Sequence, residues 1–184
     1  MDSPYYSDLR PPHNIVAPAA VTLLATDKAL HLAATIGNLS PQNWPVGKNY
    51  RIEVIGQATS AVTPGNLTLS LYWGSGADAT GTVIAATAAT AWTASQANMT
   101  WKAWFDVTIT AIGATGSMVA GGSFKINEAA IAAELLAPAT GGAVAVAVDT
   151  TASANVFSVQ AKRSGSTAET MQLSPGYPKV HALN

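Results

Sequence analysis

The chain has 184 residues, no cysteine and a formal net charge of −1 at pH 7. A chain of this length forms one domain, or one domain and an arm, and it buries roughly 70% of its unfolded surface, enough to fold without crosslinks. The lack of cysteine excludes disulfides, thiolate metal sites and a thiol nucleophile. Charged residues make up only 10% of the sequence, against about 25% in ordinary globular proteins. This composition fits either an ordinary β-protein with small-residue loops or a subunit packed in an assembly.

Charge and hydropathy also limit the possible partners. The nine Lys and Arg residues are scattered from Arg10 to Lys179, so no basic cluster predicts nucleic-acid binding. No apolar run approaches the ~20 residues of a membrane span. The N-terminal residues lack the basic start and apolar core of a signal peptide. We therefore expect no nucleic-acid partner, no membrane partner and no secretion.

Residues 1–18 differ from the rest of the chain. Their four prolines disfavour both helix and interior strand, while several aromatic and aliphatic side chains could pack on another surface. A frayed terminus is one interpretation, and an extended arm that docks on a neighbouring subunit is the other. We favour the arm, and divide the chain into an arm at 1–18 and a domain at 19–184. The docking side chains would be Tyr5, Tyr6, Leu9 and Ile15.

Two stretches show the period-two alternation of a strand with one buried face. The first runs from Tyr50 to Thr59, and another alternating segment, Leu67–Trp73, follows the turn residues of 63–66. We interpret the two segments and their turn as a hairpin. The second is Trp101–Ile126, a hairpin around a glycine-containing turn. Its inward row includes Trp101, Phe105 and Phe124, whereas Trp104 falls on the outward row.

The remaining segments complete an all-β pattern. Asn127–Ala137 is the one helix candidate, because an Asn cap and an early Glu precede Pro138. Counting gives about eight to ten strands and at most one short helix, which favours an antiparallel sandwich or barrel. Further strands are expected at Thr82–Thr87, Val144–Val148, Val156–Ala161, Thr170–Leu173 and Lys179–Leu183.

No catalytic or metal-binding pattern emerges. His13, His31 and His181 have no carboxylate or second His at ligand spacing, and no Gly-x-Ser-x-Gly sequence or phosphate loop occurs. Asp106 and Glu53 alternate outwards among Lys and Arg, so we interpret them as surface charges. We expect a protein that is not an enzyme, with no cofactor and no metal.

The five tryptophans divide into two groups. Trp73 and Trp101 fall on inward rows and are most simply core residues. Trp104 falls on an outward row, and Trp44 and Trp92 fall in loops. Exposed aromatics of this kind serve either as a sugar-binding platform or at a protein interface. The charge-poor surroundings favour the interface, whose residues would be Trp104, Ile55, Val119, Trp92 and Trp44.

The order of several segments resembles the small jelly-roll virion proteins of tailed bacteriophages, which are capsid decoration (cement) proteins and minor tail proteins. The likeness covers about residues 45–184. Two segments depart from it, the helix candidate and Ser164–Thr167. The segments that carry it are Gly47–Ala58, Asn66–Gly74, Gly81–Ala85, the Trp101–Ile126 hairpin, Val148–Ser153 and Leu183–Asn184.

The resemblance implies a jelly-roll β-sandwich of about eight strands with an extended N-terminal arm. It also implies a structural protein of the virion, assembled in the host cytoplasm, that forms a homo-oligomer, most simply a trimer. As cement it would bind the major capsid protein or other virion proteins and stabilise the head shell. A tail or baseplate component is the alternative within virions, and a carbohydrate-binding module for host glycans is the alternative from another class.

Overall fold

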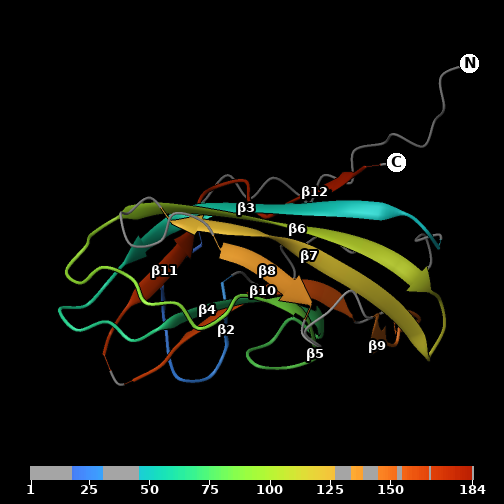
Figure 1. The fold of residues 1–184 in the computed structure, drawn as a ribbon, viewed down its shortest axis with the longest axis horizontal. Helices are drawn as coiled ribbons and strands as arrows, with labels where there is room; N and C mark the ends of the chain where they lie inside the picture. The colour runs from blue at the N-terminus through green and yellow to red at the C-terminus, as the bar shows by residue number, and fades with distance from the viewer. Residues whose placement is uncertain are drawn as a thin grey trace, which may run out of the picture.

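The computed structural model describes residues 18–30, 46–126, 134–138, 145–152, 155–165 and 167–183. These residues form strands, turns and loops and contain no helix, so none of them forms a helix able to cross a membrane (Figure 1). The strands are β1 (Val21–Thr22), β2 (Lys28–Ala29), β3 (Asn49–Thr59), β4 (Leu67–Gly74), β5 (Thr82–Ala86), β6 (Met99–Ala111), β7 (Gly116–Ile126), β8 (Glu134–Pro138), β9 (Val146–Val148), β10 (Val156–Arg163), β11 (Thr170–Leu173) and β12 (Lys179–Ala182).

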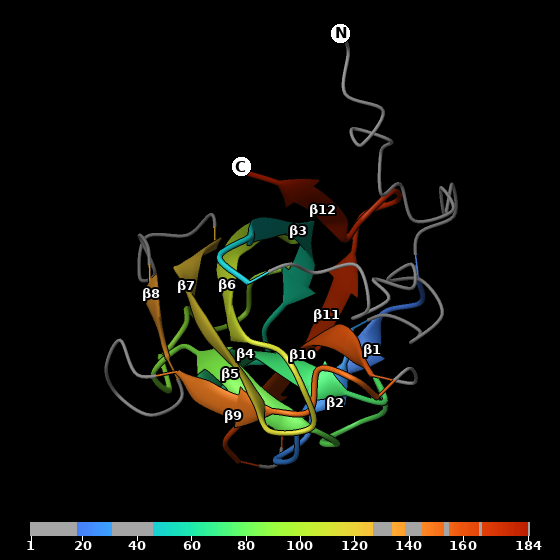
Figure 2. The same cartoon turned by 90° about the vertical axis from the view of Figure 1, so that its right-hand side faces the viewer.

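The strands form two antiparallel sheets of seven and four strands, one of them curled into a half-barrel (Figure 2). The larger sheet has the order β1-β11-β3-β6-β7, with β12 also paired to β3 and β9 also paired to β7. The smaller sheet has the order β5-β4-β10-β2. Strand β8 pairs with both β7 and β5 and so joins the two sheets along one side. The prediction of an all-β, two-sheet architecture is confirmed.

The Trp101–Ile126 hairpin is present as β6 and β7, paired from Trp101↔Ile126 to Ala111↔Ser117. Strand β3 lies on the other side of β6 over ten residue pairs, from Asn49↔Thr108 to Ala58↔Met99. The alternation read from the sequence matches the burial. In β3 every even-numbered residue from Tyr50 to Ala58 is buried, and in β6 the buried row runs from Met99 to Ile109.

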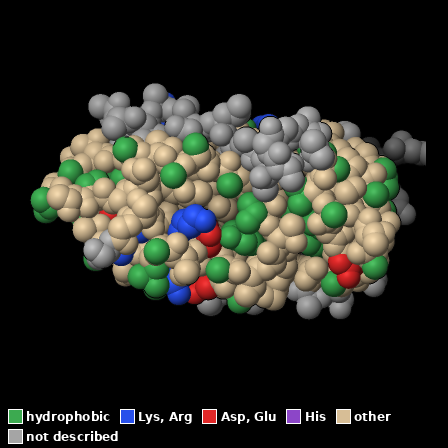
Figure 3. Space-filling model, turned by 60° about the horizontal axis from the view of Figure 1, so that its bottom comes forward, with side chains coloured by type: hydrophobic (Ala, Val, Ile, Leu, Met, Phe, Trp, Pro, Cys, Tyr) green, Lys and Arg blue, Asp and Glu red, His purple; other side chains and the backbone are tan. Residues whose placement is uncertain are grey.

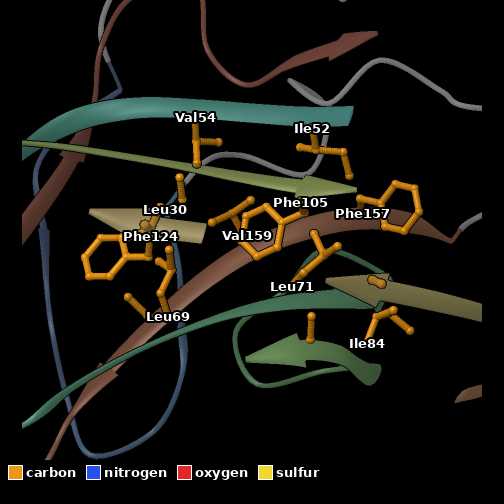
Figure 4. Packing of buried hydrophobic residues seen from close by; sticks show 14 of the residues in the cluster. Leu30, Ile52, Val54, Leu69, Leu71, Ile84, Phe105, Phe124, Phe157 and Val159 are labelled. Carbon is orange, nitrogen blue, oxygen red and sulfur yellow. The ribbon is translucent and has the colours of Figure 1, made fainter. Parts of the chain in front are cut away.

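The core fills the space between the inner faces of the two sheets (Figure 4). Ile52, Val54 and Phe105 come from the larger sheet, and Leu69 and Val159 face them from the smaller one. Aromatic pairs add edge contacts: the rings of Trp73 and Phe157 are 4.9 Å apart, and those of Trp101 and Phe124 are 6.1 Å apart. Trp73 and Trp101 are core residues, as predicted.

The predicted hairpin of residues 50–73 is wrong. Strand β3 belongs to the larger sheet and β4 to the smaller one, and the two do not pair. The turn residues at 63–66 do reverse the chain, but turn chemistry does not determine whether the next strand stays in the same sheet. Strand β4 is also buried on both faces, because Ser70 and Tyr72 are covered as well as the leucines between them.

The predicted helix at Asn127–Ala137 is wrong in its last part, since Glu134–Pro138 is strand β8. Its first part, 127–133, lies outside the described residues, as do the arm residues 1–17. The sequence Glu-Leu-Leu-Ala favours a helix locally, but in the fold it pairs with Gly122 and Ser123 on one side and with Ala86 on the other. Tertiary hydrogen bonding outweighs a weak helix propensity.

Candidate interaction surface

The outer face of β3, β6 and β7 brings together the outward residues predicted for an interface. Trp104 is half-buried on β6, directly opposite Glu53 on β3 and Ser123 on β7. Ile55 and Val119 are half-buried on the same face, on β3 and β7. Their burial is intermediate because they stand on the solvent side of a sheet whose other side forms the core. The structure therefore places Trp104, Ile55 and Val119 on one sheet face.

One bidentate ion pair occupies the row next to Trp104. Arg51 Nε and Nη2 each donate to Asp106 at 2.7 Å, and this hydrogen bonding raises the pKa of Arg51 above its ordinary value. Glu53 lies 3.8 Å from His181 Nε2 on β12. Glu53 and Asp106 are thus surface carboxylates with basic neighbours, as the sequence indicates.

Two lysines lie in the row on the other side of Trp104. Lys102 on β6 and Lys125 on β7 are directly opposite each other and both exposed. The Nζ atom of Lys102 lies 6.0 Å from the centre of the Trp104 ring. Neither lysine has a carboxylate partner among the described residues, whereas Lys28, Arg51, Lys162 and Arg163 each form an ion pair.

Trp92 does not belong to this surface, and the prediction that it is exposed is wrong. Only 5% of its surface is accessible, and its ring N–H donates to the Gly65 carbonyl oxygen at 2.9 Å. The loop that carries it folds against the end of β4, where Thr90 and Leu67 form a bridge. Trp44 and the arm residues Tyr5, Tyr6, Leu9 and Ile15 lie outside the described residues.

The outer face of the smaller sheet is covered by two segments of the chain itself. Gln160 on β10 is fully buried and hydrogen-bonds to the backbone of Ala77 and Ala79. Asp27 accepts from the Tyr72 hydroxyl at 2.9 Å and lies 3.1 Å from Lys162 Nζ. Burial, followed by the bond to Asp27, raises the pKa of Tyr72 to about 12. Simple alternation misses this layer, because it assigns polar outward residues to solvent.

A buried ion pair holds together four segments at one end of the molecule. Arg163 Nε lies 2.7 Å from Glu169 Oε2 and donates its hydrogen to the Leu23 carbonyl at 3.0 Å, so its contact with the carboxylate is electrostatic. Glu169 Oε1 accepts from Gly65 N–H and Thr167 Oγ at 2.8 Å each. Burial of charges costs free energy unless they are paired and hydrogen-bonded. The cluster therefore has a structural role, and no sequence motif predicts it.

Two features of the described ranges bear on catalytic chemistry, the distribution of possible metal ligands and an open hollow. These ranges contain no group of three or more His, Asp or Glu side chains that could hold a metal. An open hollow of about 140 Å³ lies where β3 meets β11, lined by Gln57, Gln172 and residues 173–175. Its lining holds amides, a hydroxyl and apolar groups, and no acid–base pair. On the face shown in Figure 3, charged side chains are few and uncharged atoms dominate.

Comparison with known proteins adds no relative. No family model, no curated protein and no solved structure matches the chain. The strand pairings and the surface chemistry are therefore the features from which a function can be inferred.

Proposed function

We propose that the protein is a structural virion protein of a tailed bacteriophage, a capsid decoration (cement) protein built on one jelly-roll domain. The observation that carries the proposal is the outer face of the larger sheet, where the apolar side chains of Trp104, Ile55 and Val119 are half-buried on three neighbouring strands. The resemblance of residues 45–184 to such proteins supplies the biological setting.

The strand pairings support the jelly roll. Without β7, β8, β9 and β12, eight strands remain: β1 to β6, β10 and β11. Numbered along the chain, they pair first with eighth, second with seventh, third with sixth and fourth with fifth. Such nested pairing arises when one long antiparallel hairpin is wrapped into two sheets, which is the double Greek key of a jelly roll. Strands β7, β8 and β9 are then an insertion that extends the larger sheet and joins it to the smaller.

The surface chemistry supports a subunit of an assembly. Protein interfaces are depleted of charge at their centre and enriched in aromatic residues. The face at Trp104 has the aromatic residue, and its carboxylates Glu53 and Asp106 already have basic neighbours, whereas Lys102 and Lys125 have no carboxylate partner among the described residues. We infer a homo-oligomer, most simply a trimer, whose subunits meet through this face.

As cement, the oligomer would act by mass action. It would bind the assembled lattice of the major capsid protein and not the free subunits, so opening of the shell must first break these contacts. Such binding stabilises the shell by RT ln(1 + [L]/Kd), about 2.7 kcal/mol per site at a hundredfold excess over Kd.

Imaging of particles with and without the protein tests the proposal directly. Cement predicts density at symmetry-related positions on the head, and loss of head stability when the protein is removed. Density at the tail would instead make it a tail or baseplate component. Absence from the particle would refute the virion role altogether.

Sedimentation of the purified protein tests the subunit interface. Wild type should sediment as an oligomer, and Trp104→Ala should shift it towards monomer. Ile112→Ala is the matched control, because Ile112 is 50% exposed in the β6–β7 turn. A monomeric wild type with Trp104 fully open to a fluorescence quencher would contradict the interface.

One observation favours a second function, carbohydrate binding. Trp104 lies opposite Glu53 and one row from the Arg51–Asp106 pair, and a sugar site combines a ring with such polar groups. A glycan array would reveal binding that Trp104→Ala abolishes and Ile112→Ala retains. No bound glycan would exclude this function.

A further inference from the structure

The outer face of β3, β6 and β7 carries Trp104 and two exposed lysines, Lys102 and Lys125. We propose that residues 1–17 bind there, with Tyr6 against Trp104 and Asp8 against Lys102 and Lys125. The inference goes beyond the virion role, since it concerns the free protein and depends only on this surface.

The charges beside Trp104 are not balanced among the described residues. Lys102 and Lys125 stand directly opposite each other, and like charges in such cross-strand positions are destabilising. In a chain with only 10% charged residues, two such exposed cations without a described carboxylate partner predict an anionic group that binds between them. Five described carboxylates, Asp27, Glu53, Asp78, Asp106 and Glu169, each have a basic neighbour of their own, and Asp149 accepts hydrogen bonds from Thr151.

The described chain begins beside the same sheet, at β11. The Pro18 carbonyl accepts a hydrogen bond of 2.7 Å from Gln172 Nε2 on β11. Gln172 lies opposite Gln57 on β3, and Gln57 opposite Thr100 on β6. Pro18, which follows the N-terminal segment, therefore lies on the same sheet face as the lysines. Three strand spacings separate β11 from β7, about 14 Å, whereas the ten residue steps from Asp8 to Pro18 reach about 33 Å when extended.

The spacing of Tyr6 and Asp8 in the segment matches that of Trp104 and Lys102 on β6. Prolines at 4, 11 and 12 favour an extended segment. In an extended chain, Tyr6 and Asp8 point to the same side about 6.6 Å apart. Trp104 and Lys102 are likewise two residues apart on one face of β6. Tyr6 can therefore contact Trp104 while Asp8 pairs with Lys102. Lys125 lies directly opposite Lys102, within reach of the same carboxylate.

Zero-length carbodiimide coupling of the full-length protein, followed by peptide mass spectrometry, tests the inference. The expected product joins Asp8 to Lys102 or Lys125. Tyr6→Ala and Trp104→Ala should each lower its yield at least fivefold, because they remove the aromatic contact but no coupling group. Ile112→Ala is the control and should leave the yield unchanged.

Mixing ¹⁴N- and ¹⁵N-labelled chains shows whether the product joins one chain or two, and either arrangement supports the inference. Three results would overturn it: no product from Asp8, equal coupling of Asp8 to Lys48 or Lys179, or a yield unaffected by Trp104→Ala. The purified protein is used without a phage shell. A protein absent from virions could therefore still give the product, and a cement protein could fail to give it.

Discussion

The indole ring of Trp101 lies directly against the backbone of Gly56, its cross-strand neighbour on β3. A Cβ atom at position 56 would come within 2.8 Å of this ring and within 1.9 Å of the Gln172 carbonyl oxygen. The ring N–H donates to the Gln57 carbonyl at 3.1 Å. Hydrogen in place of a side chain thus allows β3 to lie between β6 and β11 while a buried tryptophan packs over it.

We predict that Gly56→Ala destabilises the protein by about 1–3 kcal/mol, the usual cost of overpacking a core. All three close contacts of the added Cβ are with the rigid Trp101 ring or with a backbone carbonyl, which have little freedom to move. Urea unfolding measures the loss. Thr100→Ala, an exposed change on the neighbouring strand, should alter stability by less than about 0.5 kcal/mol. Equal effects of the two changes would contradict the packing argument.

The two tryptophans Trp92 and Trp104 should respond differently to truncation. Trp92→Ala removes a buried ring and its bond to Gly65, so the free energy of unfolding should fall by about 3–5 kcal/mol. Trp104→Ala removes a half-buried ring from the outer face and should cost the isolated domain less than half as much. Denaturant unfolding at low protein concentration, where association does not contribute, makes the comparison. A greater loss for Trp104 would place that ring in the core.

Breaking the buried Arg163–Glu169 pair should be costly. Glu169→Leu leaves a guanidinium that is only 5% exposed without its anion, for which we expect a loss of about 3–5 kcal/mol. The double variant Arg163→Met, Glu169→Leu should recover part of this loss, because it removes both charges. A double-mutant cycle measures the coupling. Additive losses would show that the two charges do not interact.

The ion pair between Asp78 and Lys28 predicts a dependence on pH. The Lys28 ammonium, at 2.7 Å, and the Ala29 N–H, at 2.8 Å, hold the pKa of Asp78 below its usual value. Since the pKa is lower in the folded than in the unfolded chain, the stabilisation is complete above the unfolded value of about 4. It is lost as the pH falls through the folded value.

Asp78→Asn keeps an acceptor for Ala29 but removes the charge. Because the Asp78 side chain is 48% exposed, solvent screening limits its effect at pH 7 to less than about 1 kcal/mol. The difference from wild type should shrink between pH 5 and pH 3 and in about 1 M salt, where the Debye length is about 3 Å. Urea unfolding across this range checks it, and a difference independent of pH would contradict the assignment.

Alternation predicted the larger sheet well because its strands have one wet and one buried face. Residues 50–58 of β3 and the buried row of β6 follow the pattern without exception. The pattern failed where a strand is covered on both sides. Tyr72 and Gln160 are polar residues in outward positions, yet residues 27–29 and 77–79 bury them.

Contacts that join distant segments could not be predicted from local sequence. The turn before Leu67 has the composition of a hairpin turn, but β4 pairs with β10, some ninety residues further along the chain. Trp92 lies in a loop without periodicity, and it is buried by packing in the core and by its bond to the Gly65 carbonyl, which no local pattern reveals. The outward position of Trp104, by contrast, could be predicted, because it follows from the phase of its own strand.

Strand β8 makes the two sides of the sandwich differ in how firmly the sheets are held together. On its side the two sheets are connected by a strand hydrogen-bonded to both. On the opposite side the outermost strands, β1 and β2, contribute two residue pairs each. Separation of the two sheets should therefore start at β1 and β2, and β1 closely follows the N-terminal segment in the chain. A contact that anchors the N-terminal segment would therefore stabilise β1 and β2, the edge where the sheets separate most easily. Assembly and domain stability would then be coupled through residues outside the sandwich.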